Sequence, residues 1–300
     1  MSTILNVDKI CKSFGNNKAL DNVSFKVKSG QIMGFIGPNG AGKTTAIKVI
    51  LGLQKMDSGN VYINNNNINK NFEKALERVG AIVENPDSYT YLTGRENLKL
   101  IANLYNDVKD EYIEELIDLV KLRDSIDLKV SKYSLGMRQR LGIASSLINK
   151  PNLLVLDEPT NGLDPEGIKD LRDIIINIVK KNKSAVLVSS HNLAELDNFC
   201  TDICLINKGK IVEIININDI KKKDEPSYSI VVDKSSGLEN FINKGEKINN
   251  KTLKVMRNKD EIALLVKELV LNGYKIYEVK KDAVTLEEAY LKEIGGNIFE

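Results

Sequence analysis

The chain has 300 residues, of which 42% are hydrophobic and 28% are charged, and its formal net charge at pH 7 is +2. This length and composition are typical of a soluble globular protein with one large domain or two smaller ones. The small net charge gives no electrostatic basis for binding nucleic acid, so we expect no nucleic-acid partner.

No run of apolar residues reaches the roughly 18–20 residues that a membrane-spanning helix needs. Residues 1–10 carry charges and lack the long apolar region of a signal peptide. The three cysteines fit a reducing compartment. Cys200 and Cys204 have no nearby histidine, so we interpret them as small buried hydrophobic residues rather than metal ligands. We therefore expect a cytosolic chain, or one docked on a membrane through another protein.

The first part of the chain alternates between strand and helix patterns. Residues 23–30 alternate apolar and polar side chains, as a half-buried strand does, and residues 31–37 form a continuous apolar strand. A helical spacing follows in "AGKTTAIKVILGL" (41–53), and "GNVYINN" (59–65) returns to a strand pattern. The asparagine tract 64–67 predicts a solvated hairpin turn.

A helical segment interrupts this alternation over about residues 92–150. Residues 93–105 and 110–122 both place apolar side chains at steps of three and four. Ser134 then caps a further helix that extends to about Asn149. We interpret the segment as a helical insertion into the core.

The strand pattern resumes after the insertion. Residues 152–158 and 184–190 are predicted to form buried strands. A helix is predicted between them, with Asp164 as its cap and a proline in its first turn. A short helix is predicted over 192–200. Buried strands that alternate with helices favour a mostly parallel sheet and therefore an α/β fold.

The remaining residues predict a separate accessory domain. Residues 216–226 are polar, charged and end in proline, as a linker often does. We therefore expect an N-terminal domain over 1–217 and a small α+β domain over 226–300. The predicted order in the latter is strand 228–233, helix 238–243, strand 252–257, helix 260–272, strand 275–280 and helix 285–294. This part contains no recognisable catalytic constellation.

The segment "GPNGAGKTT" (37–45) follows a buried strand and opens a helix, as a phosphate-binding loop does. Its glycines let backbone N–H groups wrap phosphates, and the helix N-terminus adds a favourable potential. Lys43 would reach the β- and γ-phosphates of a nucleotide, the hydroxyl of Thr44 would bind Mg²⁺, and Thr45 would reach the α-phosphate. The alternative, a glycine-rich turn without a ligand, fits this context poorly. The predicted ATP-binding residues here are Gly37, Pro38, Asn39, Gly40, Ala41, Gly42, Lys43, Thr44 and Thr45.

Two later strands end in further candidate catalytic groups. Asp157 ends the buried strand "LLVLDE" and can hold Mg²⁺ through water, and Glu158 would orient and activate the attacking water. His191, the only histidine in the chain, closes the strand "AVLVSSH" and could reach the γ-phosphate. The alternatives are a pair of solvated carboxylates and a structural histidine.

A second helix start lies in "YSLGMRQR" (133–140), where Ser134 and Gly136 form a second anion site. The first loop already wraps the phosphates, so this site cannot easily face the same phosphates within one subunit.

Together these motifs resemble the ATP-binding subunit of ABC transporters over roughly residues 1–215. The resemblance implies a P-loop ABC-type ATPase core with a helical signature subdomain, ATP and Mg²⁺ as ligands, and a second ATP-binding subunit packed head to tail. It implies that Phe14, in "KSFG", stacks on adenine, although burial in a strand core is the alternative for this residue. It also implies that Asp164, in "NGLD", contacts the partner subunit, although it could cap a helix as well. The signature residues that would bind the partner's ATP are Ser134, Leu135, Gly136 and Met137.

The chain departs from the family pattern at two places. The signature has Leu135, Gly136 and Met137 where the family usually has Gly-Gly-Gln, but it retains Ser134 and Gly136. Glu84 stands where the family normally has Gln. A carboxylate ligates Mg²⁺ more strongly than an amide and repels the γ-phosphate when the metal is absent. The hypothesis is that Glu84 ligates Mg²⁺ and couples Mg-ATP to a membrane partner.

Glu84, the segment "YSLGMRQRLGIA" and the C-terminal extension together resemble the subgroup that exports peptide antibiotics, which includes bacitracin-resistance and lantibiotic-immunity transporters. The resemblance implies an ATPase that powers export through a separate integral-membrane permease and sits on the inner face of the cell membrane through that permease. The alternative is an ABC-type ATPase that acts on ribosomes, but such proteins usually carry two ATPase domains. DNA-repair ATPases of the coiled-coil kind have long heptad repeats, which this chain lacks, and a metabolic kinase would not explain residues 134–136.

Overall fold

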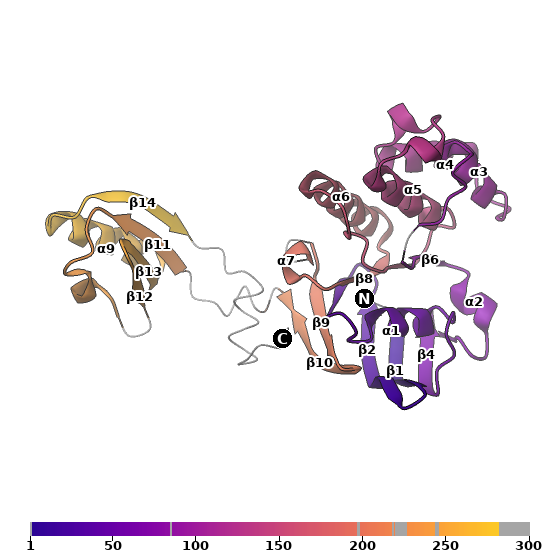
Figure 1. The fold of residues 1–300 in the computed structure, drawn as a ribbon, viewed down its shortest axis with the longest axis horizontal. Helices are drawn as coiled ribbons and strands as arrows, with labels where there is room; N and C mark the ends of the chain where they lie inside the picture. The colour runs from indigo at the N-terminus through magenta and orange to yellow at the C-terminus, as the bar shows by residue number, and fades with distance from the viewer. Residues whose placement is uncertain are drawn as a thin grey trace. The chain divides into compact units, whose positions relative to one another are not determined.

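The computed structural model describes residues 2–84, 86–196, 199–217, 219, 227–243 and 246–281. The chain divides into two compact units, with the boundary between Asn216 and Ile217. Each unit has its own sheet and core (Figure 1). Among the described residues, no helix combines the length and the apolar character needed to cross a membrane.

A six-stranded sheet forms the centre of the first unit, with the order β10-β9-β3-β8-β7-β6. Five of these strands run parallel to their neighbours, and β10 pairs antiparallel with β9. Every residue of β3, β7 and β8 is buried, as expected for strands covered on both faces. The predicted parallel sheet is therefore confirmed. Its strands are β3 (Ile32–Ile36), β6 (Val79–Ile82), β7 (Leu153–Leu156), β8 (Ala185–Ser190), β9 (Asp202–Asn207) and β10 (Lys210–Asn216).

A second, antiparallel sheet with the order β2-β1-β4-β5 packs beside the first. Asn64 and Asn65 adopt positive φ angles of 50° and 64° in the turn between β4 and β5. Asparagine tolerates this left-handed region well, so the asparagine tract forms the hairpin turn that we predicted. The strands are β1 (Thr3–Phe14), β2 (Asn17–Lys28), β4 (Ser58–Ile63) and β5 (Asn66–Asn67).

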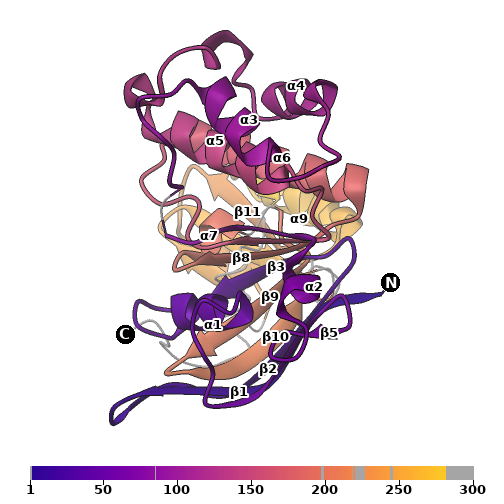
Figure 2. The same ribbon diagram turned by 90° about the vertical axis from the view of Figure 1, so that its right-hand side faces the viewer.

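The helix α1 (Lys43–Ile50) packs between the two sheets (Figure 2). Buried side chains from α1 and both sheets form one hydrophobic core, in which the rings of Phe25 and Phe35 lie 5.3 Å apart. The long helix α6 (Pro165–Asn182) covers the opposite face of the six-stranded sheet (Figure 2). Two shorter helices, α2 (Phe72–Leu76) and α7 (Leu193–Leu196), complete this part of the unit.

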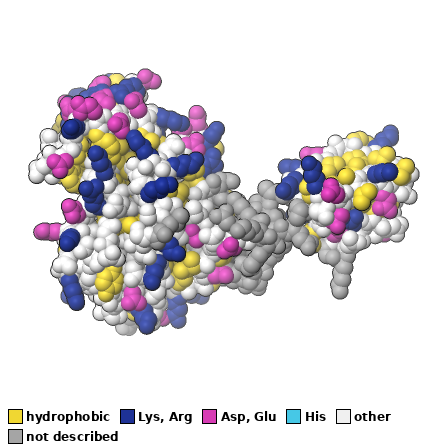
Figure 3. Space-filling model, turned by 180° about the vertical axis from the view of Figure 1, so that it is seen from behind, with side chains coloured by type: hydrophobic (Ala, Val, Ile, Leu, Met, Phe, Trp, Pro, Cys, Tyr) yellow, Lys and Arg dark blue, Asp and Glu magenta, His cyan; other side chains and the backbone are white. Residues whose placement is uncertain are grey.

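The predicted helical segment forms α3 (Gly94–Ala102), α4 (Asp110–Leu119) and α5 (Leu135–Leu147), which lie together on one side of the strands, with α5 packed against β6 (Figure 1). Short 3₁₀ turns at Arg123–Ser125 and Val130–Lys132 connect α4 with α5. On the face shown in Figure 3, basic and acidic side chains are interspersed over this unit. That mixture fits the small net charge of the chain.

Side-chain caps mark the starts of α3, α5 and α6. The hydroxyl of Ser134 accepts a hydrogen bond from the backbone N–H of Met137 at 3.2 Å, so Ser134 caps α5 as predicted. Asp164 caps α6 in the same way, through the N–H of Gly167 at 2.9 Å. Thr93 and Glu96 form a reciprocal capping box at the start of α3.

The second unit is a four-stranded antiparallel sheet, in the order β12-β13-β11-β14, that packs against the helix α9. Its elements are β11 (Ser227–Val232), a 3₁₀ turn at Leu238–Phe241, β12 (Lys247–Asn249), β13 (Thr252–Met256), α9 (Lys259–Leu271) and β14 (Ile276–Lys281). Sequence patterns did not predict β12, which has only three residues. The predicted helix at 285–294 and most of the predicted linker at 216–226 lie outside the described residues.

A buried ion pair stabilises the second unit. Both carboxylate oxygens of Glu246 accept hydrogen bonds from the guanidinium of Arg257 at 2.9 Å, and the Glu246 side chain is only 2% exposed. Burial, the largest influence, raises the pKa of Glu246, but hydrogen bonds from Arg257 and from the backbone N–H groups of Asn243 and Met256 outweigh it and leave the pKa below its usual value. The pair therefore stabilises the fold at neutral pH and loses this effect as the pH falls through the lowered pKa of Glu246.

We predict that Arg257→Ala destabilises the second unit by about 3 kcal/mol at pH 7, because it leaves a buried carboxylate without its cation. The pKa of Glu246 then rises, so the loss should be smaller at about pH 4, where protonation removes the charge. Amide hydrogen exchange in β11 and β13 would measure the effect. Lys259→Ala, an exposed change in the same unit, is the control. Equal losses of stability at both pH values would contradict the prediction.

Candidate functional site

Four neighbouring parallel strands end at one edge of the central sheet, and each is followed by a predicted site residue. The phosphate-binding loop follows β3, and His191 follows β8. Asp157 and Glu158 follow β7, and Glu84 lies two residues beyond the end of β6. The carboxyl ends of parallel strands are the usual place for a ligand in an open α/β sheet.

The loop after β3 needs glycine because backbone from other strands approaches it closely. A Cβ on Gly42 would lie 2.6 Å from the carbonyl oxygen of Ala19, and Gly42 has a φ of 106°. A Cβ on Gly37 would collide with the carbonyl oxygen of Ile206. The helix α1 begins directly after Gly42 without a side-chain cap. The first N–H groups of α1 are therefore available to an anion.

The amino group of Lys43 lies back against the loop. Its Nζ donates hydrogen bonds to the carbonyl oxygens of Gly37 at 2.7 Å and Pro38 at 3.3 Å, and the side chain is only 6% exposed. The same Nζ lies 3.2 Å from Oε1 of Glu158. The structure thus brings together the predicted phosphate-binding lysine and the predicted catalytic glutamate.

The carboxylate of Glu158 also contacts the chain's only histidine. Its Oε2 lies 2.8 Å from Nδ1 of His191, so the carboxylate bridges Lys43 and His191. Glu158 has a φ of 48°, in the left-handed region that a non-glycine residue rarely adopts. A strained backbone at this point fits a functional position.

Sequence reasoning missed Ser189, which contacts both acidic residues. Ser189 is fully buried, and its Oγ donates to Oδ1 of Asp157 at 2.6 Å and accepts from the backbone N–H of Glu158 at 2.8 Å. Asp157 is itself only 2% exposed. The available signal was a pair of serines that interrupts the apolar strand just before His191.

Glu195 is a second residue that sequence reasoning missed. Its Oε2 accepts hydrogen bonds from Oγ1 of Thr160 at 2.5 Å and from Oγ of Ser190 at 3.0 Å. Thr160 lies in the segment between Glu158 and Asp164, and Ser190 directly precedes His191. The carboxylate of Glu195 therefore ties the loop after β7 to the end of β8.

A cavity of about 720 Å³ lies over the loop, large enough for a nucleotide. Phe14 lines it and is 50% exposed, with its ring 5.4 Å from Nζ of Lys12. This exposure argues against the alternative in which Phe14 belongs to the strand core. The other predicted residues that line the cavity are Asn39, Gly40, Gly42, Lys43, Thr44, Thr45, Glu158 and His191, and Lys18, Asn161 and Lys208 were not predicted.

The signature residues line a different cavity, of about 490 Å³. Ser134, Leu135 and Gly136 face Asp164 and its neighbours there, whereas Met137 contributes its backbone N–H to the cap of α5. Among the described residues, this cavity and the one over the phosphate loop have no lining residue in common. The signature therefore lies apart from the phosphate loop of the same chain. This separation agrees with our expectation that the signature does not face the phosphates bound by its own chain.

The structure does not place Glu84 in the cavity over the loop. Its side chain is 63% exposed and pairs with Lys48 of α1 at 2.7 Å. Thr44 lines the cavity, and the buried Asp157 directly precedes Glu158, which also lines it. Hydroxyl and carboxylate oxygens are donors that Mg²⁺ prefers. Among the described residues, no group of three His, Cys, Asp or Glu side chains could hold a metal ion by itself. A site shared by Thr44, Asp157 and nucleotide phosphates would suit Mg²⁺, which usually binds through one or two carboxylates and substrate phosphates.

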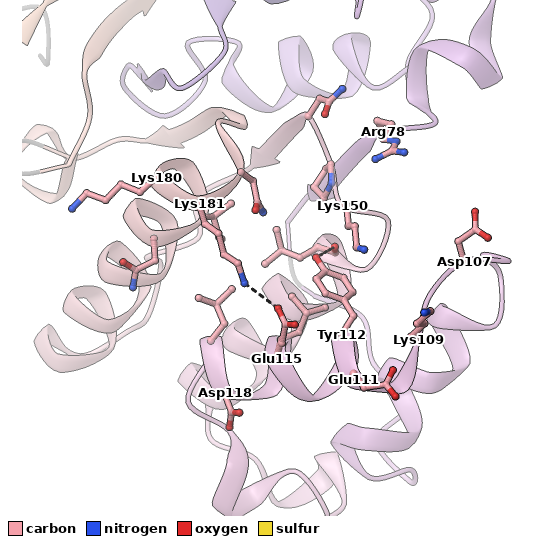
Figure 4. Close-up of a pocket in the computed structure, with 18 residues that line it drawn as sticks. Arg78, Asp107, Lys109, Glu111, Tyr112, Glu115, Asp118, Lys150, Lys180 and Lys181 are labelled. Carbon is pink, nitrogen blue, oxygen red and sulfur yellow. Dashed lines mark hydrogen bonds and ion pairs between the residues drawn. The ribbon is translucent and has the colours of Figure 1, made fainter.

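A third cavity, of about 1460 Å³, is an open groove between α4 and α6 (Figure 4). Lys181 pairs with Glu115 across it at 2.9 Å (Figure 4). Lys150 lies 4.6 Å from the ring centroid of Tyr112, whose hydroxyl donates to the carbonyl oxygen of Leu147, and burial raises the pKa of Tyr112 to about 12. The Lys181–Glu115 pair joins α4 to α6, and the contacts of Tyr112 join α4 to the end of α5 and the residues just after it. None of the predicted site residues lines the groove.

Comparisons with known proteins agree with this geometry. The family described as ABC transporter matches residues 20–161. The chain is 36% identical over 306 residues to the bacitracin transport ATP-binding protein BcrA of Bacillus licheniformis, with 99% of each chain covered. It is 39% identical over 209 residues to the lantibiotic transport ATP-binding protein SrtF of Streptococcus pyogenes, over 70% of this chain and 89% of that protein.

Solved structures show the same fold. A nucleotide-free ATP-binding cassette from an ABC transporter matches with a TM-score of 0.66 and 28% identity, over 74% of this chain and 94% of that chain. The predicted fold, a P-loop ABC-type ATPase core with a helical segment, is confirmed. The chain therefore belongs to the ATP-binding subunits of ABC transporters, and it is an ATPase.

Proposed function

We propose that this ATPase powers the export of a peptide antibiotic, or a related amphipathic compound, through a separate membrane permease. The observation that carries the substrate class is the similarity to the bacitracin transport protein, which extends over 99% of both chains and so includes both units. The chain would then lie on the inner face of the cell membrane, docked there through its permease.

Each residue around the phosphate loop would have a separate role in ATP hydrolysis. Lys43 would bind the β- and γ-phosphates, and Phe14 would stack on the adenine ring. Thr44 and Asp157 would hold Mg²⁺, which when bound offsets the phosphate charge. Glu158 would orient the attacking water and accept its proton, and His191 would hold the γ-phosphate. This arrangement accelerates hydrolysis mainly by positioning and by stabilising charge.

The separation of the two cavities supports a paired enzyme. The loop cavity lacks the signature residues, and the signature cavity lacks Lys43. A second ATP-binding subunit, packed head to tail, would supply Ser134 and Gly136 to the γ-phosphate of its neighbour. Asp164 lines the signature cavity and would contact the partner there, in addition to capping α6.

A set of exposed apolar side chains in the segment that follows Glu84 in the sequence, which we call the apolar patch, supports a membrane partner. Tyr89 and Tyr91 are 52% and 66% exposed, and their rings lie 5.8 Å apart. The buried side chain of Asn97 holds their loop against α3, because it bonds both the N–H and the carbonyl oxygen of Tyr89. Leu104, just beyond α3, is 78% exposed. We assign this patch as the permease-docking surface.

The alternative, an ABC-type ATPase that acts on ribosomes, has less support. The relatives that cover 99% of this chain include transport proteins by name. Identification of the bound partner decides between the two functions.

We predict that Glu158→Gln lowers the rate of ATP hydrolysis by at least about a hundredfold, because the amide cannot accept the proton from water. ATP binding should persist, so the variant should accumulate as an ATP-bound pair that gel filtration detects. Glu73→Gln, an exposed change on α2, is the control. Normal hydrolysis by the Glu158 variant would contradict the role given to this residue.

We predict that Glu84→Ala reduces permease-dependent ATP hydrolysis in native membranes while changing the thermal stability of the protein little. The stability change is small because an exposed ion pair contributes at most about 1 kcal/mol. Lys48→Ala breaks the same ion pair but keeps the carboxylate, and it should leave the coupling intact. If both variants behave alike, or if Glu84→Ala retains full coupling, the hypothesis for Glu84 fails.

The proposed function predicts that tagged Glu158→Gln protein, expressed in its native cell and recovered from gently solubilised membranes with Mg-ATP, co-purifies with a multi-span membrane protein. Adding Tyr91→Ser and Leu104→Ser should reduce this recovery severalfold, because these changes remove apolar contact area. Leu53→Ser, at an exposed leucine just after α1, should not reduce it. Recovery with ribosomes or soluble proteins alone would overturn the transport assignment and leave the ATPase activity standing.

A further inference from the structure

Ser189 is an unusual residue for its place in the fold. It lies near the end of β8, is fully buried, and follows four buried apolar residues of the same strand. A buried hydroxyl group is costly unless it is hydrogen-bonded. The hydroxyl of Ser189 bonds the two residues that directly follow the neighbouring strand β7, rather than its own backbone.

The register between β7 and β8 explains these contacts. Leu156 aligns with Val188 in the parallel pair, so the next residues, Asp157 and Ser189, meet where β7 ends. The Oγ of Ser189 donates to Oδ1 of Asp157 at 2.6 Å and accepts the N–H of Glu158 at 2.8 Å. A serine hydroxyl has only one proton to donate. Because this proton goes to Asp157, the oxygen lone pairs remain to accept the N–H of Glu158.

These hydrogen bonds constrain the two carboxylates differently. The bond to Asp157 is a short, charge-assisted one, and it occupies Oδ1 while leaving Oδ2 for another ligand. The bond to Glu158 holds the backbone at a residue whose φ is 48°. That backbone conformation directs the Glu158 carboxylate between Lys43 and His191.

We infer that Ser189 is a positioning residue for ATP hydrolysis, whose single hydroxyl orients both Asp157 and Glu158. This inference rests on the roles proposed above for these two acidic residues. Ser189 itself touches neither water nor nucleotide in this assignment. It acts by fixing the direction of the Asp157 carboxylate toward Mg²⁺ and the backbone that carries Glu158.

Ser184 provides a matched control for a purely structural role. It is 2% exposed and lies just before β8, at the opposite end of the strand from the site. Its Oγ donates to the carbonyl oxygen of Pro151 at 2.7 Å. Ser184→Ala therefore removes a buried hydroxyl and its hydrogen bond, whereas Ser189→Ala removes a buried hydroxyl and two hydrogen bonds. The hydroxyl of Ser184 bonds a backbone carbonyl and neither of the two carboxylates.

The test compares Ser189→Ala with Ser184→Ala in the full-length protein. For Ser189→Ala we expect kcat to fall about tenfold to a hundredfold, the usual effect of losing a hydrogen bond to a charged group. We also expect the Mg²⁺ concentration for half-maximal hydrolysis to rise about tenfold, as it does when a partner of a metal ligand is removed. ATP binding without Mg²⁺, measured at equilibrium, should be unchanged, which shows that the variant is folded. Ser184→Ala should match the wild type in all three measurements.

Two further variants distinguish a failure of the site assignment from a failure of the role inferred for Ser189. Asp157→Asn and Glu158→Gln should each abolish most hydrolysis; if they do not, the site assignment fails and the inference fails with it. If both lose hydrolysis while Ser189→Ala behaves like Ser184→Ala, the site assignment stands and the positioning role of Ser189 is overturned. Ser189→Thr keeps the hydroxyl and should retain more activity than Ser189→Ala.

Discussion

The site depends on the parallel pairing of β3, β8, β7 and β6, because parallel neighbours end at the same edge of a sheet. The order of these strands in the sheet differs from their order in the sequence. Residues that are far apart in the sequence therefore meet at that edge. Lys43 and Glu158 are separated by more than a hundred residues, yet Nζ and Oε1 lie 3.2 Å apart. The covering helices and the second sheet bury these strands and thereby hold their ends in place.

Sequence patterns predicted those parts of the fold that a few adjacent residues determine. The glycine-rich loop, the caps at Ser134 and Asp164, and the asparagine turn all depend on a few adjacent residues, and the structure contains each of them. The buried strands were predictable because strands covered on both faces are continuously apolar. The short strand β12 was not predictable, because three residues carry too little pattern.

Contacts that depend on strand register could not be predicted. The pairing of Leu156 with Val188 sets the meeting of Asp157 with Ser189, and no spacing within either strand encodes it. The same holds for Glu195, whose partners lie in the loop after β7 and at the end of β8. The ion pair of Glu84 with Lys48 joins two segments that are far apart in the sequence, so local patterns could not predict it, and the proposed role of Glu84 as a Mg²⁺ ligand stays a prediction.

The position of Lys43 has a consequence for the proposed order of events. Its amino group contacts two loop carbonyls and the carboxylate of Glu158, so the proposed base is restrained by the cation that we propose binds phosphate. A phosphate group that drew Lys43 away would leave Glu158 with His191 as its remaining partner. In the proposed mechanism, binding of the nucleotide would thereby also free the base that activates the attacking water.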